Sequence, residues 1–116
     1  MADKSLDLLQ GTLDVLVLLT LTWGPMHGYA VSRWIRERTN GVIEIQDAPL
    51  YKSLHRLERA GSVKAEWGLS DNNRRARYYE LTAAGKRALR AQESAWRAYA
   101  QAVYLVLDPS VSPTGA

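Results

Sequence analysis

One segment, Asp47–Leu81, constrains the fold more than any other part of the chain. Its first half predicts a helix over Asp47–Ala60, because apolar residues recur there at spacings of four and three and would form one buried face. Those residues are Leu50, Leu54 and Leu57. Asp47 is the expected N-cap, and Gly61 is expected to end the helix in the left-handed conformation that side chains disfavour.

Two short strands follow this helix. Residues Ser62–Trp67 alternate between apolar and polar side chains, and Arg74–Leu81 is expected to return as the second strand. Between them lies a turn rich in Gly, Ser, Asp and Asn. A helix followed by a hairpin is the order of a winged helix-turn-helix, in which the hairpin is the wing.

Three more helices complete the prediction, and they are expected over Ser5–Leu21, Gly28–Thr39 and Ala83–Leu107. Thr82 should cap the last of these. Residues 23–28 are expected to form a turn, and Val42–Ile45 is compatible with a single edge strand. In the second helix, the side chains expected to face inward are Tyr29, Val31, Trp34 and Ile35. The predicted fold class is mainly α (α+β), a winged helix-turn-helix with a long C-terminal helix.

Positive charge is concentrated on the predicted helix and wing. Residues 52–90 hold ten Lys or Arg residues and four acidic ones, against five and eight in the remainder of the chain. Such a patch suits the phosphates of double-stranded DNA, whereas the simpler interpretation is a solvated charged face. The residues expected to contact bases or phosphates are Tyr51, Lys52, His55, Arg56, Lys64, Arg74, Arg75 and Arg77.

The last helix carries an apolar stripe that predicts a homodimer. Leu89, Trp96 and Val103 recur every seven residues, and Tyr99 and Val106 form a second pair with this spacing. A small winged domain can cover the first turns of such a helix but not its whole length, so a second copy is the simplest partner. In the alternative, the helix folds back over its own domain. A two-fold dimer would favour a palindromic operator, with recognition helices about 34 Å apart.

The sequence offers little for chemistry. It has no cysteine, only two histidines (His27 and His55), and no acidic cluster or Gly-rich phosphate loop, so we expect no catalytic site, no metal and no cofactor. His27 is more consistent with a helix cap than with a ligand. No signal peptide or membrane span is evident, which makes a cytoplasmic location the default. The expected domains are 1–82 (winged helix-turn-helix), 83–108 (dimerisation helix) and 109–116 (flexible tail).

Several stretches together resemble the PadR family of bacterial transcriptional regulators. They are Leu9–Asp14, Gly24–Tyr29, Leu50–Tyr51, Leu54–Glu58, Glu66–Gly68, Asn72–Tyr79 and Leu81–Gly85. The resemblance implies a dimeric winged-helix repressor, released from DNA by a small molecule in some members. The single long final helix is similar to that of the small subfamily. Family DNA contacts carry over to matching residues at Tyr51, Arg56, Arg74, Arg75 and Arg77.

The resemblance also bears on ligands and on DNA sequence. Some small members bind flat aromatic compounds between tryptophans at the dimer interface, which implicates Trp96 as an effector-binding residue; the alternative is that Trp96 only fills the interface. Lys52 stands where relatives often have proline, so the operator sequence cannot be transferred. The alternative function is a winged-helix adaptor whose basic face meets an acidic protein without specific DNA binding.

Overall fold

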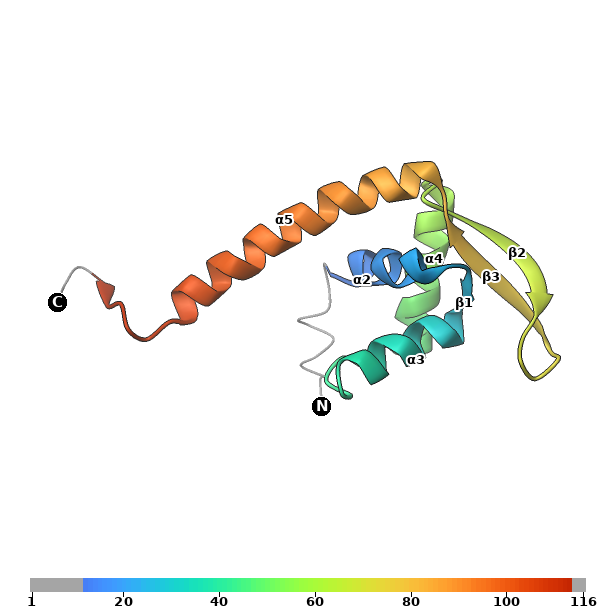
Figure 1. Ribbon diagram of the computed structural model, residues 1–116, viewed down its shortest axis with the longest axis horizontal. Helices are drawn as coiled ribbons and strands as arrows, with labels where there is room; N and C mark the ends of the chain where they lie inside the picture. Colours follow the sequence, from blue (N-terminus) through green and yellow to red (C-terminus); the bar gives the residue numbers. More distant parts are fainter. Residues whose placement is uncertain (1–11, 114–116) are drawn as a thin grey trace.

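The computed structural model describes residues 12–113, which form a mainly helical α+β fold (Figure 1). In chain order the elements are α2 (Leu13–Thr20), the 3-10 turn η1 (Leu21–Trp23), β1 (Met26–His27), α3 (Gly28–Arg38), α4 (Asp47–Arg59), β2 (Val63–Leu69), β3 (Arg75–Leu81) and α5 (Ala83–Leu107). Figure 1 shows α2, α3 and α4 gathered together, with the β2–β3 hairpin projecting on one side and α5 on the other. This is the predicted winged helix-turn-helix.

The helix predictions agree closely with the structure. The last helix spans Ala83–Leu107, and the Thr82 hydroxyl accepts a hydrogen bond from the Gly85 N–H, as a cap should. Gly61 ends α4 with φ +77°. The N-cap of α4 is Gln46 rather than Asp47, which is the first helical residue instead. There its carboxylate complements the positive end of the helix dipole. The predicted start of the first helix, Ser5, lies outside the described residues.

The sheet differs from the prediction, because it has three strands in the order β1-β3-β2. Met26 and His27, expected to lie in a turn, pair antiparallel with Tyr79 and Tyr78 of β3. Two residues are too few to show an alternating pattern. They form a strand because their backbone groups satisfy the otherwise open edge of β3.

The predicted edge strand at Val42–Ile45 is wrong. This segment between α3 and α4 belongs to no strand. The Ile43 N–H donates to the Thr39 hydroxyl at 3.1 Å, so its hydrogen-bond partner is a side chain and not the backbone of a neighbouring strand. Ile45 is buried and Ile43 packs against the core, which explains the alternating pattern without a sheet.

The core lies where α2, α3, α4, the hairpin and the start of α5 meet. Its buried apolar side chains are Val15, Val17, Leu18, Leu21, Val31, Ile35, Ile45, Leu50, Leu54, Leu57, Val63, Tyr79, Leu81 and Leu89. Burying one Leu or Val side chain contributes about 1.5–3 kcal/mol, so this cluster holds the helices against the wing. Val31 and Ile35 face inward as predicted, but Tyr29 is 60% exposed. It lies in the first turn of α3, where its ring stacks beside His27.

Candidate nucleic-acid interface

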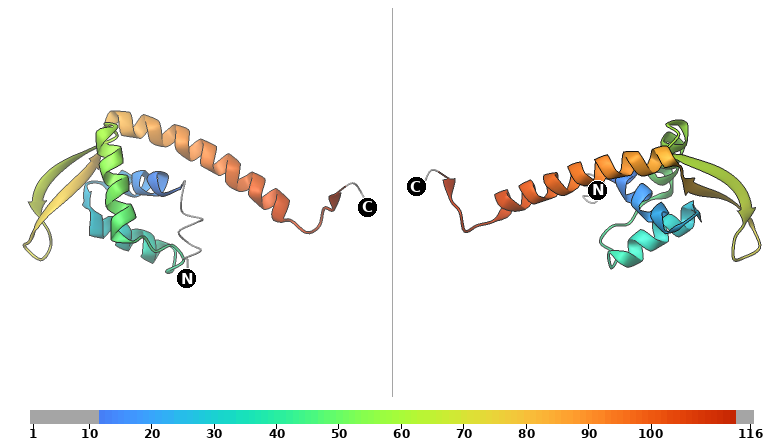
Figure 2. Two further views of the ribbon diagram at one scale, coloured as in Figure 1. Left: turned by 180° about the vertical axis from the view of Figure 1, so that it is seen from behind. Right: turned by 45° about the horizontal axis from the view of Figure 1, so that its top comes forward.

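Helix α4 presents one polar face to solvent. Leu50, Leu54 and Leu57 are buried, as predicted. Seen from behind (Figure 2, left), α4 stands in front of the other helices, with the hairpin beside it. The exposed side chains of this face are Tyr51, Lys52, His55, Arg56 and Arg59. The DNA contacts predicted from sequence did not include Arg59, although its helical spacing from His55 and Lys52 places it on the same face.

Tyr51 is held in place by the start of α3. His27 caps this helix, with its Nδ1 accepting a hydrogen bond from the Ala30 N–H at 3.1 Å, which agrees with the capping role expected for it. The ring of Tyr51 lies against Gly28, where an added Cβ would be 2.8 Å from Tyr51 Oη. A side chain at position 28 would therefore displace Tyr51.

Arg56 is already bonded within the chain. Its Nε donates to Asp14 Oδ2 at 3.1 Å, and its Nη2 donates to Asp14 Oδ1 at 2.6 Å. The buried Ser53 hydroxyl donates to the same Oδ1 at 2.6 Å. Burial alone would raise the pKa of the Asp14 carboxyl, but the hydrogen bonds from Arg56 and Ser53 and the charge of Arg56 outweigh it and lower that pKa. Asp14 thus joins α2 to α4.

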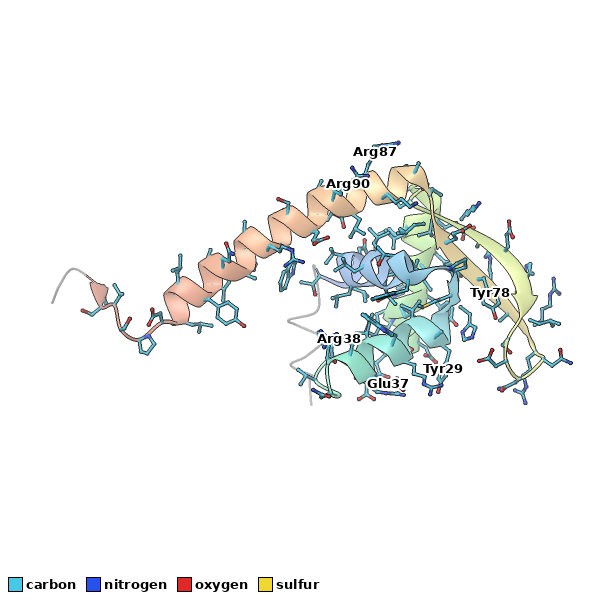
Figure 3. All side chains as sticks on the ribbon, in the orientation of Figure 1. Tyr29, Glu37, Arg38, Tyr78, Arg87 and Arg90 are labelled. Atoms are coloured by element: carbon cyan, nitrogen blue, oxygen red, sulfur yellow. The ribbon has the colours of Figure 1, made fainter. Side chains whose placement is uncertain are left out.

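The wing is a regular antiparallel hairpin that runs from Val63 opposite Leu81 to Leu69 opposite Arg75. The Tyr78 hydroxyl donates to the Leu69 carbonyl oxygen at 2.7 Å, and Asn73 takes φ +61° in the turn. Figure 3 shows Tyr78 on the hairpin, on the side that faces α3. These contacts order the strand that carries the wing arginines.

The predicted cationic contacts of the wing fall into two groups. Arg77 donates to Glu58 at 2.8 Å, and Lys64 lies 3.2 Å from Glu80, so both have a carboxylate partner. Arg74 and Arg75 are exposed and lie in none of the ion pairs found among residues 12–113. The guanidinium of Arg75 lies 4.3 Å above the centre of the Trp67 ring, which orients it without neutralising it.

A groove of about 1020 Å³ separates the helices from the wing. It brings together four of the predicted DNA contacts, namely Tyr51, His55, Arg75 and Arg77. Tyr29 and Arg33 of α3 also line it, and sequence reasoning did not select them. The amphipathic pattern had placed Tyr29 inside and gave no sign that the start of α3 meets the wing.

A second groove, of about 1030 Å³, lies between α2 and α5. Of the five residues predicted for dimerisation, Trp96, Tyr99 and Val103 line it. Val106 is exposed outside it, whereas Leu89 is 6% exposed and belongs to the core of its own chain. The available apolar surface of α5 therefore begins after Leu89, and Arg56 reaches the same groove from α4.

Comparison with known proteins identifies the family. The family described as "Transcriptional regulator PadR-like family" matches residues 15–91, more than half of the chain. The chain belongs to this family. It is also 31% identical over 103 residues to an uncharacterised protein of Lysinibacillus sphaericus, covering 88% of this chain and 94% of that one.

Solved structures of PadR-like and other regulators share the fold. A transcriptional regulator of Clostridium thermocellum is 26% identical with a TM-score of 0.79, over 88% of this chain and 99% of that one. A PadR family transcriptional regulator of Eggerthella lenta is 32% identical with a TM-score of 0.74, over 90% and 89% of the two chains. The protein is accordingly a DNA-binding transcriptional regulator of a non-enzymatic family.

The structure of this PadR-like chain also bears on other classes of site. Between residues 12 and 113, no group of three or more His, Asp or Glu side chains is placed to hold a metal ion. None of the helices described has the length and apolar character that crossing a membrane requires.

Proposed function

We propose that this PadR-like regulator is a dimeric repressor that binds a palindromic operator and is released by a small planar aromatic effector. The observation that carries the DNA-binding part is the exposed polar face of α4 beside a wing with two arginines that pair with no carboxylate among residues 12–113. In this proposal Tyr51, Lys52, His55 and Arg56 lie in the major groove, where they reach bases or phosphates. Arg59 adds a phosphate contact at the end of the helix.

The wing grips the neighbouring backbone or minor groove. Arg74 and Arg75 supply the net positive charge, since each is exposed and neither is in an ion pair within the described residues. Arg77 and Lys64 lie beside them and contribute less, because Glu58 and Glu80 already neutralise them. The affinity for DNA should therefore fall as the salt concentration rises, with a slope set by a small number of phosphate contacts.

The dimer would form through α5, with residues 1–82 as the DNA-binding domain, 83–108 as the dimerisation helix and 109–116 as a tail. Beyond Leu89 this helix exposes Trp96, Tyr99, Val103 and Val106 to solvent in the single chain. Figure 1 shows α5 extending beyond α2, α3 and α4, so the described part of the winged domain leaves the far turns of this helix uncovered. A second copy is the partner that two-fold symmetry supplies without any additional protein.

The effector would bind at this interface. Trp96 is 41% exposed in the groove between α2 and α5, so part of its ring is available to a ligand. Two copies of Trp96 across a two-fold axis would enclose a slot for a flat aromatic molecule. Occupation of the slot would change the angle between the two winged domains and hence the spacing of the recognition helices.

A competition experiment tests the DNA-binding part. DNA fragments retained by the purified protein are sequenced, and a labelled retained fragment is then challenged with unlabelled fragment or random DNA of equal length. If the protein is a sequence-specific repressor, the unlabelled fragment displaces the labelled one at a far lower concentration than random DNA does. Equal competition by both would favour the adaptor, in which the basic face meets an acidic protein.

A further inference from the structure

Asp14 holds the guanidinium of Arg56 by one edge and leaves the other edge open. The bonded edge consists of Nε and one N–H of Nη2, which reach the two carboxylate oxygens at 3.1 and 2.6 Å. A guanidinium has five N–H groups, so three remain, and none of these three meets an acceptor within residues 12–113. Two of the three, on Nη1 and Nη2, are parallel. This open edge has the geometry that pairs with O6 and N7 of guanine.

The carboxylate is itself fixed to α4. Ser53, which is completely buried, donates to Asp14 Oδ1 at 2.6 Å. Ser53 and Arg56 lie three residues apart on α4, so Asp14 contacts adjacent turns of the same helix. The side chain of Asp14 is 33% exposed and that of Arg56 is 54% exposed. The carboxylate is thus the more covered end of the pair, and both side chains line the groove between α2 and α5.

We propose that Asp14 is a positioning residue for DNA recognition, which presents the open edge of Arg56 to a guanine and thereby sets sequence preference at one position of each half-site. The proposal rests on the proposed function, since it requires α4 to lie in the major groove. A freely rotating arginine would satisfy a phosphate as readily as a base. An arginine held in one orientation before binding loses less freedom on meeting the correct base.

The charge of Asp14 gives the proposal a distinctive signature. A carboxylate near the DNA surface repels phosphates of every sequence and partly neutralises Arg56. Replacing Asp14 with asparagine removes this repulsion and also one of the two acceptors that hold the guanidinium. Affinity for random DNA should therefore rise while discrimination falls. A residue that only stabilised the fold would lower the affinity for all DNA.

The experiment compares Asp14→Asn and Arg56→Lys, singly and together, with the full-length wild-type protein. Binding to an operator selected from a random library, to operators altered at one base pair and to random DNA is measured by fluorescence anisotropy at one salt concentration. Asparagine keeps an acceptor for Ser53, and thermal unfolding checks the fold of each variant. Glu93→Gln is the matched control, because Glu93 also pairs with an arginine, is also 33% exposed and lies on α5 outside the proposed DNA contacts.

We expect Asp14→Asn to lower the ratio of operator to random-DNA affinity by about fivefold or more, with the loss concentrated at one base pair per half-site. Arg56→Lys should cause the same loss, and the double variant should lose no more than either single one. Glu93→Gln should leave the ratio unchanged. If folded Asp14→Asn kept its preference for the operator, or lost equal affinity for operator and random DNA, this inference would be overturned. The proposed function would still stand. Wild-type protein without sequence preference would instead overturn the proposed function.

Discussion

At the scale of single residues, Gly28 determines where Tyr51 can lie. Because Gly28 does not have a positive φ, alanine there is compatible with the backbone, and its Cβ would meet only the outer atoms of the Tyr51 ring. Tyr51 is 40% exposed and can swing outward. We therefore expect Gly28→Ala to preserve thermal stability but to weaken operator binding by about two- to twelvefold, which corresponds to one hydrogen bond of about 0.5–1.5 kcal/mol. Tyr51→Phe, which removes only the hydroxyl, is the control; operator affinity unchanged in both variants would exclude Tyr51 from the interface.

The Asp14 carboxyl also predicts a pH dependence of stability. Its pKa is lowered in the folded chain, since burial is outweighed by the bonds from Arg56 and Ser53. A lowered carboxyl pKa stabilises the fold fully above the unfolded value of about 3.9, and this contribution is lost as pH falls through the folded value. The urea-unfolding free energies of wild type and Asp14→Asn should thus differ at pH 7 and converge as the pH falls below about 3.9. If the two proteins still differed in unfolding free energy in acid, Asp14 would act through packing and not through its charge.

At the scale of elements, the wing carries arginines with different surroundings. Arg74 and Arg75 are exposed, whereas Arg77 bonds to Glu58 of α4. We expect Arg74→Ala with Arg75→Ala to weaken binding to all DNA sequences alike and to lower the salt slope by roughly one to two units, about 0.9 for each phosphate that is no longer neutralised. Arg77→Ala is the matched control on the same strand and should lower stability while changing the slope little. If the double variant kept full affinity for DNA at moderate salt, the wing would not be a DNA contact.

Elements were predictable from sequence where their own residues determine them. The spacing of Leu50, Leu54 and Leu57 was sufficient to place α4, and the Thr82 cap with a long apolar stripe was sufficient to place α5. β1 could not be predicted, because its two residues become a strand only when β3 lies beside them. The same holds for the site: Asp14 and Arg56 are 42 residues apart, and only the packing of α2 on α4 makes them partners.

At the scale of the whole molecule, the two surfaces with proposed roles meet at Arg56 and otherwise lie on different parts of one elongated chain. Figure 3 shows Arg87 and Arg90 on the outer side of the first turns of α5, away from α2, so this side is polar. The apolar residues Trp96, Tyr99 and Val103 lie further along and border the groove with α2. A partner helix would therefore meet α5 beyond its first turns. Arg56 lines this groove from α4, so one helix contacts both the effector region and the proposed DNA surface.

Trp96 connects dimerisation to effector binding, and its removal tests both. We expect Trp96→Ala to weaken the dimer, because a large apolar side chain leaves the interface, and to abolish binding of planar aromatic compounds. Such a compound would gain about 0.5–1.5 kcal/mol per ring from stacking beyond simple burial. Sedimentation measures the dimer, and tryptophan fluorescence follows titration with a flat polycyclic dye. Trp23→Ala is the control for fluorescence, because Trp23 is exposed beside Trp34 and does not line the groove between α2 and α5. If Trp96→Ala retained wild-type affinity for the dye, Trp96 would serve packing alone and the effector site would lie elsewhere.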